Sequence, residues 1–176
     1  MRAVLSIGSN LGDRLARLQA VVDGLGESVR AVSPVYETEA WGGVEQDCFL
    51  NAVVVADDPG LDADGWLRRG QELERDNERV RSLRWGPRTL DVDVVCCHDD
   101  GTEVFSDTAD LMLPHPLAHQ RAFVLLPWLA VDPAAHLTVG GRQTPVGELL
   151  DALPVAERDG VRRTALTLAV AGRAAR

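Results

Sequence analysis

The sequence predicts an α+β fold with a ferredoxin-like βαββαβ core, in which an antiparallel sheet is flanked by helices and the two core helices share one face. Three observations lead to this class: short segments of β-rich composition, two segments that begin with helix-capping residues, and the order in which these alternate. The chain has 176 residues, which suits a single domain spanning residues 1–176.

The first half of the chain contains the predicted core. Residues 3–7 are apolar and form the first strand, and a helix follows Asp13 until Gly24 and Gly26 interrupt its three- and four-residue apolar spacing. Residues 29–36 and 49–56 are rich in β-branched residues and form the next two strands.

A second helix is predicted at about 62–78, where Asp62 and Asp64 stand at a cap position and few β-branched residues follow. Residues 90–95 complete the core as its fourth strand.

The second half of the chain adds further elements to this core. Residues 119–130 form an apolar helix that contains Pro127. Thr144 and Pro145 form a cap and first-turn pair that opens a helix ending near residue 153, and residues 161–170 form a last strand.

Composition excludes several classes of function. No apolar run approaches the roughly 20 residues of a membrane span, and the first residues are typical of a strand and not of a signal peptide, so we expect a cytoplasmic protein. The net charge of −9 argues against a nucleic-acid partner. The three cysteines are interpreted as structural thiols, since they are too few for a disulfide framework.

All 18 basic residues are Arg, which excludes a Schiff-base lysine and a Walker A motif. Any phosphate must therefore be bound by Arg, whose planar guanidinium matches bidentate contact with phosphate oxygens.

The most informative stretch joins an Arg-rich segment to two carboxylates. Side chains alternate along a strand, so Asp91 and Asp93 share one face, about 6–7 Å apart, while Leu90, Val92 and Val94 share the other. Five Arg residues against two acidic ones make the segment 75–88 locally positive by +3 (5 − 2). Taken alone, Asp-Val-Asp is more often a solvated strand face, but carboxylates beside an Arg cluster are the parts of a magnesium-nucleotide site.

The segment Arg84-Trp-Gly-Pro-Arg-Thr-Leu-Asp-Val-Asp-Val-Val resembles the signature of the 6-hydroxymethyl-7,8-dihydropterin pyrophosphokinases, enzymes of folate biosynthesis. Further similar motifs follow one another in the order of that family: Ile7-Gly-Ser-Asn-Leu-Gly, Tyr36-Glu-Thr, Phe49-Leu-Asn-Ala, Gln71 with Glu74, Pro114-His115, and Arg121 with Phe123. The resemblance implies the ferredoxin-like fold and transfer of pyrophosphate from ATP to the hydroxymethyl group of a reduced pterin.

The resemblance also implies roles for individual residues. Asp91 and Asp93 would be ligands to two Mg²⁺ ions that bridge the ATP phosphates, and Arg79, Arg88 and Asp93 would be catalytic. The residues implied to bind ATP are Gln71, Glu74, Arg81, Arg84, Trp85, Arg88, His115 and Arg121. The residues implied to bind the pterin are Gly8, Thr38, Trp41, Phe49, Asn51 and Phe123.

Ring chemistry independently favours the pterin set, because a flat heteroaromatic ring binds well between two aromatic faces with an amide at its polar edge. By composition alone, plain core packing explains Phe49 and Phe123 equally well, and His115 is more often structural. The sequence also differs from some members, which carry Pro-Pro-Leu where Glu39-Ala40-Trp41 stands or Tyr at the position of Phe49.

Two alternative functions remain at this level: a ferredoxin-like RNA-binding or regulatory module, and a magnesium-dependent phosphotransferase with another acceptor. The acidic charge disfavours the first, and only Phe49, Asn51 and Phe123 argue against the second. We expect a monomer that acts on ATP and a hydroxymethyl dihydropterin and binds neither nucleic acid nor membrane. The tail from about Asp159 has no assigned chemistry.

Overall fold

The structure is a computed structural model that describes residues 1–39, 47–77 and 89–171. The elements of the first half are β1 (Arg2–Ser9), α1 (Arg14–Leu25), the 3₁₀ helix η1 (Gly26–Ser28), β2 (Val29–Val32), β3 (Tyr36–Thr38), β4 (Phe49–Asp57), α2 (Ala63–Asp76) and β5 (Asp91–Asp99). Those that follow are β6 (Thr102–Val104), β7 (Ser106–Asp107), β8 (Met112–Leu113), η2 (Ala118–Gln120), α3 (Ala122–Val131), β9 (His136–Val139), β10 (Arg142–Pro145), α4 (Val146–Asp151), α5 (Val155–Asp159) and β11 (Val161–Arg163).

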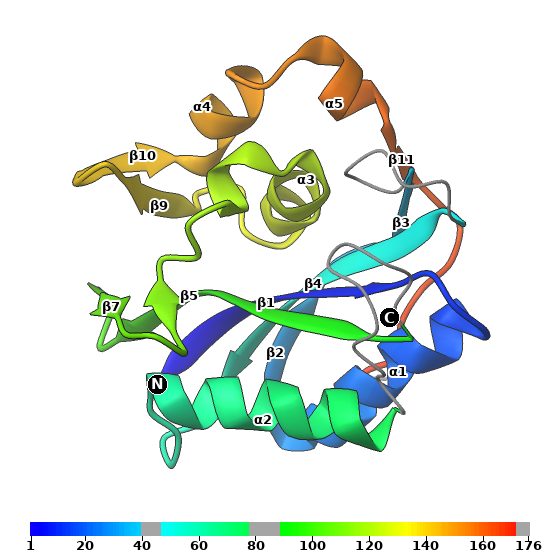
Figure 1. Ribbon diagram of the computed structural model, residues 1–176, viewed down its shortest axis with the longest axis horizontal. Coiled ribbons are helices and arrows are strands. Elements are labelled where there is room, and N and C mark those ends of the chain that lie inside the picture. Colours follow the sequence, from blue (N-terminus) through cyan, green and yellow to red (C-terminus); the bar gives the residue numbers. More distant parts are fainter. Residues whose placement is uncertain (40–46, 78–88, 172–176) are drawn as a thin grey trace.

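Within the described residues, seven strands join in one antiparallel sheet. Six of them follow the order β11-β3-β4-β1-β5-β6, and the seventh, β2, pairs with a different part of β4 than β3 does. Figure 1 shows β4, β1 and β5 at the centre of this sheet. The central order places β1 between β4 and β5, as a βαββαβ unit with split pairing requires. The predicted α+β class and ferredoxin-like core are confirmed.

The predicted capping residues begin both core helices. The Asp13 side chain accepts a hydrogen bond from the backbone N–H of Ala16, and Asp62 accepts one from the N–H of Gly65. Each carboxylate therefore satisfies an amide that the first helical turn leaves without a partner.

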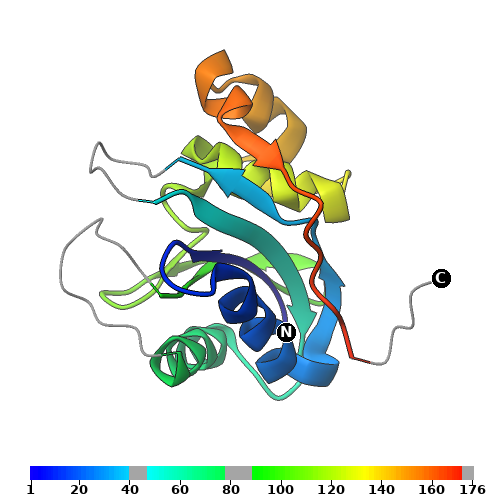
Figure 2. The same cartoon turned by 90° about the vertical axis from the view of Figure 1, so that its right-hand side faces the viewer.

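Helices cover both faces of the sheet, as Figures 1 and 2 show. One core is formed between the sheet and the helices α1 and α2, with Leu18, Trp66 and Leu73 among its buried residues. The other lies between the sheet and α3, around Leu125 and Trp128. The prediction that the two core helices share one face is therefore confirmed for α1 and α2. The apolar helix α3 of the second half covers the opposite face.

The second predicted strand is interrupted at Pro34, which divides it into β2 and β3. Proline has no N–H for a sheet ladder. At this break the Ser33 hydroxyl accepts a hydrogen bond from the backbone N–H of Val53 at 2.9 Å. The side chain thus replaces a ladder contact, and both short strands stay paired with β4.

Three expectations for the second half need correction. The apolar helix begins at Ala122, after a short 3₁₀ turn, and not at residue 119. Thr144 lies in β10, where its hydroxyl donates to the Arg142 carbonyl, so it does not cap a helix. The last strand ends at Arg163 because the chain then leaves β3 for α1, where the Gln19 amide bonds the backbone of Ala169 in both directions.

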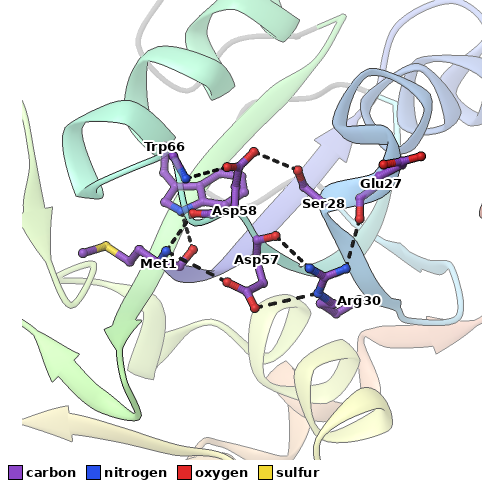
Figure 3. Close-up of polar contacts among 8 residues, drawn as sticks. Met1, Glu27, Ser28, Arg30, Asp57, Asp58 and Trp66 are labelled. Atoms are coloured by element: carbon purple, nitrogen blue, oxygen red, sulfur yellow. Dashed lines mark hydrogen bonds and ion pairs between the residues drawn. The ribbon is translucent and has the colours of Figure 1, made fainter.

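Helix α2 is attached to the sheet near its start, as Figure 3 shows. The indole N–H of Trp66 donates to the carbonyl of Met1 at 3.1 Å, and the amino group of Met1 donates to the carbonyl of Asp58 at 2.7 Å. These contacts hold the first turn of α2 against the beginning of β1. Among the described residues, no helix has the length and apolar character needed to cross a membrane.

Candidate active site

One row of paired residues crosses three central strands. Gly8 of β1 is paired with Asn51 of β4 on one side and with Asp91 of β5 on the other. Directly paired residues of antiparallel strands point to the same face, and two strand spacings separate Asn51 from Asp91 by about 10 Å. Two of the predicted pterin residues, Gly8 and Asn51, therefore share one face of the sheet with the predicted metal ligand Asp91.

The alternation predicted for β5 is confirmed. Val92 and Val94 are buried in the core beneath α1 and α2, while Asp91 and Asp93 are only partly buried. The two carboxylates consequently project from the opposite face, toward the side of the sheet that α3 covers.

Asp93 lies beside two groups from distant parts of the chain. The guanidinium Nη1 of Arg121 donates to Asp93 Oδ2 at 3.2 Å, and His115 Nε2 lies 3.9 Å from the same oxygen. The Arg121 side chain is 9% exposed, whereas that of Asp93 is 36% exposed. A buried cation therefore faces a carboxylate that solvent and ligands can reach.

Two hydrogen bonds hold His115 in one orientation. Its backbone N–H donates to the Val95 carbonyl at 2.8 Å, and its Nδ1 accepts from the N–H of Leu117 at 3.1 Å. Burial and, to a smaller extent, the positive charge of Arg121 lower the pKa of His115 to about 4, although the negative charge of Asp91 acts in the opposite direction. The neutral ring thus carries its proton on Nε2 and presents a donor toward Asp93.

The predicted pterin residues near Gly8 form a connected group. The Asn51 amide donates through Nδ2 to the Thr38 hydroxyl at 2.8 Å, and both side chains are buried. A Cβ at Gly8 would lie 2.9 Å from Asn51 Oδ1 and 3.7 Å from the Phe49 ring. Glycine therefore leaves open the space in front of the amide oxygen and the aromatic edge.

Phe123 lies in the first turn of α3, two residues after Arg121. The Arg121 guanidinium is 5.7 Å from the centroid of the Phe123 ring, within cation–π range. Arg121 therefore links the predicted stacking residue Phe123 to the predicted metal ligand Asp93.

Gln71 and Glu74 lie on α2, which packs against β5. Glu74 is 5% exposed, and its Oε1 accepts a hydrogen bond from the backbone N–H of Val92 at 2.9 Å. Gln71 is half-buried. The structure thus brings Glu74 to the strand of the two Asp residues.

Six predicted site residues lie outside the described residues: Trp41, Arg79, Arg81, Arg84, Trp85 and Arg88. Sequence reasoning overlooked two buried side chains at the end of β1. The Ser9 hydroxyl donates to the Thr89 carbonyl at 2.6 Å, and the Asn10 amide donates to the Asp47 carbonyl at 3.2 Å. The signal was a pair of polar residues, Ser9 and Asn10, at the point where a buried strand ends.

The donor set at this site fits magnesium. The described residues contain no group of three or more His, Cys, Asp or Glu side chains placed to hold a metal ion. Asp91 and Asp93 supply two carboxylates on one face, and Mg²⁺ is usually held by one or two carboxylates with water and substrate phosphates as its other ligands.

The described part of the chain also lines hollows at both ends of β1. One of about 310 Å³ is beside the start of β4, and there Arg14 bonds both Glu37 and the Cys48 carbonyl. A larger one of about 760 Å³ lies at the other end of β1, where Arg2 is 3.8 Å from Asp132. Neither hollow is lined by Asp91 or Asp93.

Known proteins resemble this chain in sequence and fold. A family model described as 7,8-dihydro-6-hydroxymethylpterin-pyrophosphokinase (HPPK) matches residues 4–133. The 2-amino-4-hydroxy-6-hydroxymethyldihydropteridine pyrophosphokinase of Mycobacterium leprae is 60% identical over 173 residues, covering 95% of this chain and 91% of that protein. The Mycobacterium tuberculosis protein of the same name is 58% identical over 166 residues, covering 92% and 88%.

Solved structures add a likeness of fold. An HPPK-DHPS in complex with substrates has a TM-score of 0.58 at 13% identity, over 86% of this chain. A Plasmodium falciparum HPPK-DHPS triple mutant has a TM-score of 0.62 at 13% identity, over 92% of this chain. The chain spans 43% and 46% of these two structures. The match over residues 4–133 and the two mycobacterial relatives show that this chain belongs to the 7,8-dihydro-6-hydroxymethylpterin-pyrophosphokinase family.

Proposed function

We propose that this protein transfers pyrophosphate from ATP to 6-hydroxymethyl-7,8-dihydropterin, giving AMP and the pterin diphosphate in folate biosynthesis. Membership of the family supports this activity, as do the names of the mycobacterial relatives. The observation that carries it is the row Asn51–Gly8–Asp91, which sets the Asn51 amide about two strand spacings from the Asp91 carboxylate.

In the proposed reaction, the hydroxymethyl oxygen attacks the β-phosphorus of ATP in line. A new oxygen–phosphorus bond forms, the bond from the β-phosphorus to the α–β bridging oxygen breaks, and AMP leaves with that oxygen. We assign Asp93 as the acceptor of the hydroxyl proton, and Arg79 and Arg88 as the groups that neutralise charge on the moving phosphates.

The pterin ring lies between Phe49 and Phe123 in this proposal, with the Asn51 oxygen accepting hydrogen bonds from its amino edge. Thr38, Trp41 and Gly8 line the same pocket. In this proposal the hydroxymethyl arm extends from the pocket toward Asp91, where the phosphates are proposed to bind.

The metal requirement is proposed as two Mg²⁺ ions held by Asp91 and Asp93. Asp91 and Asp93 would hold such ions, which would supply stabilisation of the negative charge on the attacking and leaving oxygens. The chain's own residues hold the nucleotide around them: Gln71, Glu74, Arg81, Arg84, Trp85, His115 and Arg121 are assigned to ATP binding. His115 suits this role because its neutral ring offers an Nε2–H donor without added charge.

The decisive experiment is product analysis with ATP, Mg²⁺ and 6-hydroxymethyl-7,8-dihydropterin. We expect AMP and a pterin diphosphate in equal amounts. ADP with a pterin monophosphate would show single phosphoryl transfer, and no reaction with the pterin would refute the proposed acceptor.

We further propose that residues 1–176 act as one domain, as a monomer in the cytoplasm. The monomer is tested by light scattering after size-exclusion chromatography, where a molar mass near 19.0 kDa is expected and one twice as large would contradict it.

A further inference from the structure

The outer edge of β5 is covered at the point where the two carboxylates lie. β5 pairs with β1 along its length, whereas β6 joins its other edge only from Cys97 onward. Before Cys97, backbone groups on that outer edge form hydrogen bonds with a helix side chain and with a loop. Val92 N–H donates to Glu74 Oε1, and the Val95 carbonyl accepts from the N–H of His115. A helix side chain and a loop amide thus take the place of a neighbouring strand.

Helix α2 touches Val92 at a second point, one turn before Glu74. A Cβ added at Gly70 would lie 3.2 Å from Val92 Cγ1 and 3.4 Å from the Val92 carbonyl oxygen. Residues four apart lie on the same helix face, so Gly70 and Glu74 approach Val92 together. The absence of a side chain at Gly70 lets the helix come close enough for Glu74 to reach the Val92 amide.

We propose that Gly70 and Glu74 form a Val92 clamp, which sets the position of Asp91 and Asp93 for the metal–nucleotide complex. Both carboxylates are bonded through the backbone to Val92, so a displacement or tilt of Val92 moves them together. Glu74 acts here as a positioning residue through the strand, because its Oε1 is bonded to the Val92 amide and its side chain is 5% exposed. This inference rests on the proposed function for the role of the two Asp residues.

Three properties make Glu74 suited to the clamp. A carboxylate oxygen forms a shorter and stronger hydrogen bond to an N–H than a neutral acceptor does. The bond is buried, so water does not compete for the Val92 amide. Helix α2 is also fixed near its start, where Trp66 bonds the Met1 carbonyl about 12 Å from Glu74 along the helix axis, so the helix is attached to the sheet at both ends.

The test compares three substitutions in the full chain. Gly70→Ala inserts a methyl group against Val92 without touching any group assigned to ATP, and Ala is the better helix former. Glu74→Leu removes the acceptor, and Glu74→Gln keeps an oxygen at the same place. Gly147→Ala is the matched control, because a Cβ there meets nothing within 4 Å.

Two readouts follow the clamp without turnover. Amide hydrogen exchange at Val92 should accelerate at least 10-fold in Glu74→Leu and stay within about 3-fold of wild type in Glu74→Gln. Binding of Mn²⁺ in the presence of a non-hydrolysable ATP analogue, followed by electron paramagnetic resonance, should weaken roughly 10-fold in Gly70→Ala and remain normal in Gly147→Ala. Pterin binding alone should be unchanged in all four variants.

Turnover then completes the test. We expect kcat to fall roughly 10-fold in Gly70→Ala, since small displacements of catalytic groups cost about this much, while the KM for pterin is unchanged. Normal Mn²⁺ affinity and kcat in Gly70→Ala, together with normal exchange at Val92 in Glu74→Leu, would leave Glu74 only its proposed nucleotide contact and overturn the clamp. The exchange rate at Val92 tests the clamp even if the wild-type protein makes no pterin diphosphate, so the two proposals fail separately.

Discussion

The Thr38 hydroxyl orients the amide that we assign to the pterin edge, and Thr38→Val tests this arrangement with little change of shape. Asn51 Nδ2 donates to Thr38 Oγ1 at 2.8 Å, which leaves Asn51 Oδ1 on the side of Gly8. Valine removes the acceptor, so the buried amide N–H loses its partner and the amide can rotate to expose its NH₂ group in place of its oxygen.

The size of the effect follows from burial. Asn51 is 4% exposed and Thr38 is 5% exposed, so an unpaired amide N–H costs about 1–3 kcal/mol of folding free energy. For a domain of this size each kcal/mol lowers the Tm by about 2–4 °C. Loss of one oriented acceptor should also weaken pterin binding about 10-fold, which corresponds to about 1.4 kcal/mol.

The assay combines pterin titration by fluorescence, urea unfolding, and steady-state kinetics. We expect Thr38→Val to raise the KM for pterin with kcat within about twofold, since the amide contacts the ring and not the moving phosphates. Thr38→Ser keeps an oxygen in the same place and should behave as wild type. If Thr38→Val binds pterin as tightly as wild type, the Thr38 hydroxyl does not orient the amide.

Three further predictions concern separate parts of the molecule. Asp93→Asn should retain the fold, as seen by circular dichroism, and lower kcat at least about 100-fold, because the site loses a charged ligand and proton acceptor; full activity at saturating Mg²⁺ would remove Asp93 from the mechanism. Gly8→Ala should raise the pterin KM more than 10-fold with ATP affinity unchanged, since its Cβ would lie 2.9 Å from the amide oxygen in front of the proposed ring site, and equal loss for both substrates would contradict this. Burial raises the pKa of Cys97 to about 12 and that of Cys96 well above its usual value, so both thiols stay protonated at pH 8, and a thiol reagent should label only Cys48 in the native protein; rapid labelling that persists in Cys48→Ser would show the reasoning to be wrong.

Much of the fold could be predicted because its signals are local in the chain. Asp13 and Asp62 begin their helices through contacts three residues away, so a short window of sequence contains the cause. The alternation around Val92 likewise follows from the two-residue period of a strand. The family signature beside it is also contiguous, which is why membership was visible before any tertiary contact was known.

Elements whose stability comes from distant partners were predicted less well. The divided second strand depends on Ser33 meeting Val53, and the last strand ends because Gln19 binds the tail near Ala169. Helix α3 covers the second face of the sheet, which no local pattern indicates, since its apolar residues show only that it is buried somewhere.

The same division holds within the candidate active site. That Asp91 and Asp93 share a face can be predicted from the sequence, because alternate residues of one strand point the same way. In contrast, Arg121 bonds Asp93 from 28 residues away, and Glu74 bonds the amide between the two carboxylates from 18 residues away, and neither contact has a local signal in the chain. These contacts depend on strand register and helix docking, which are set by the packing of the whole core and not by any one segment.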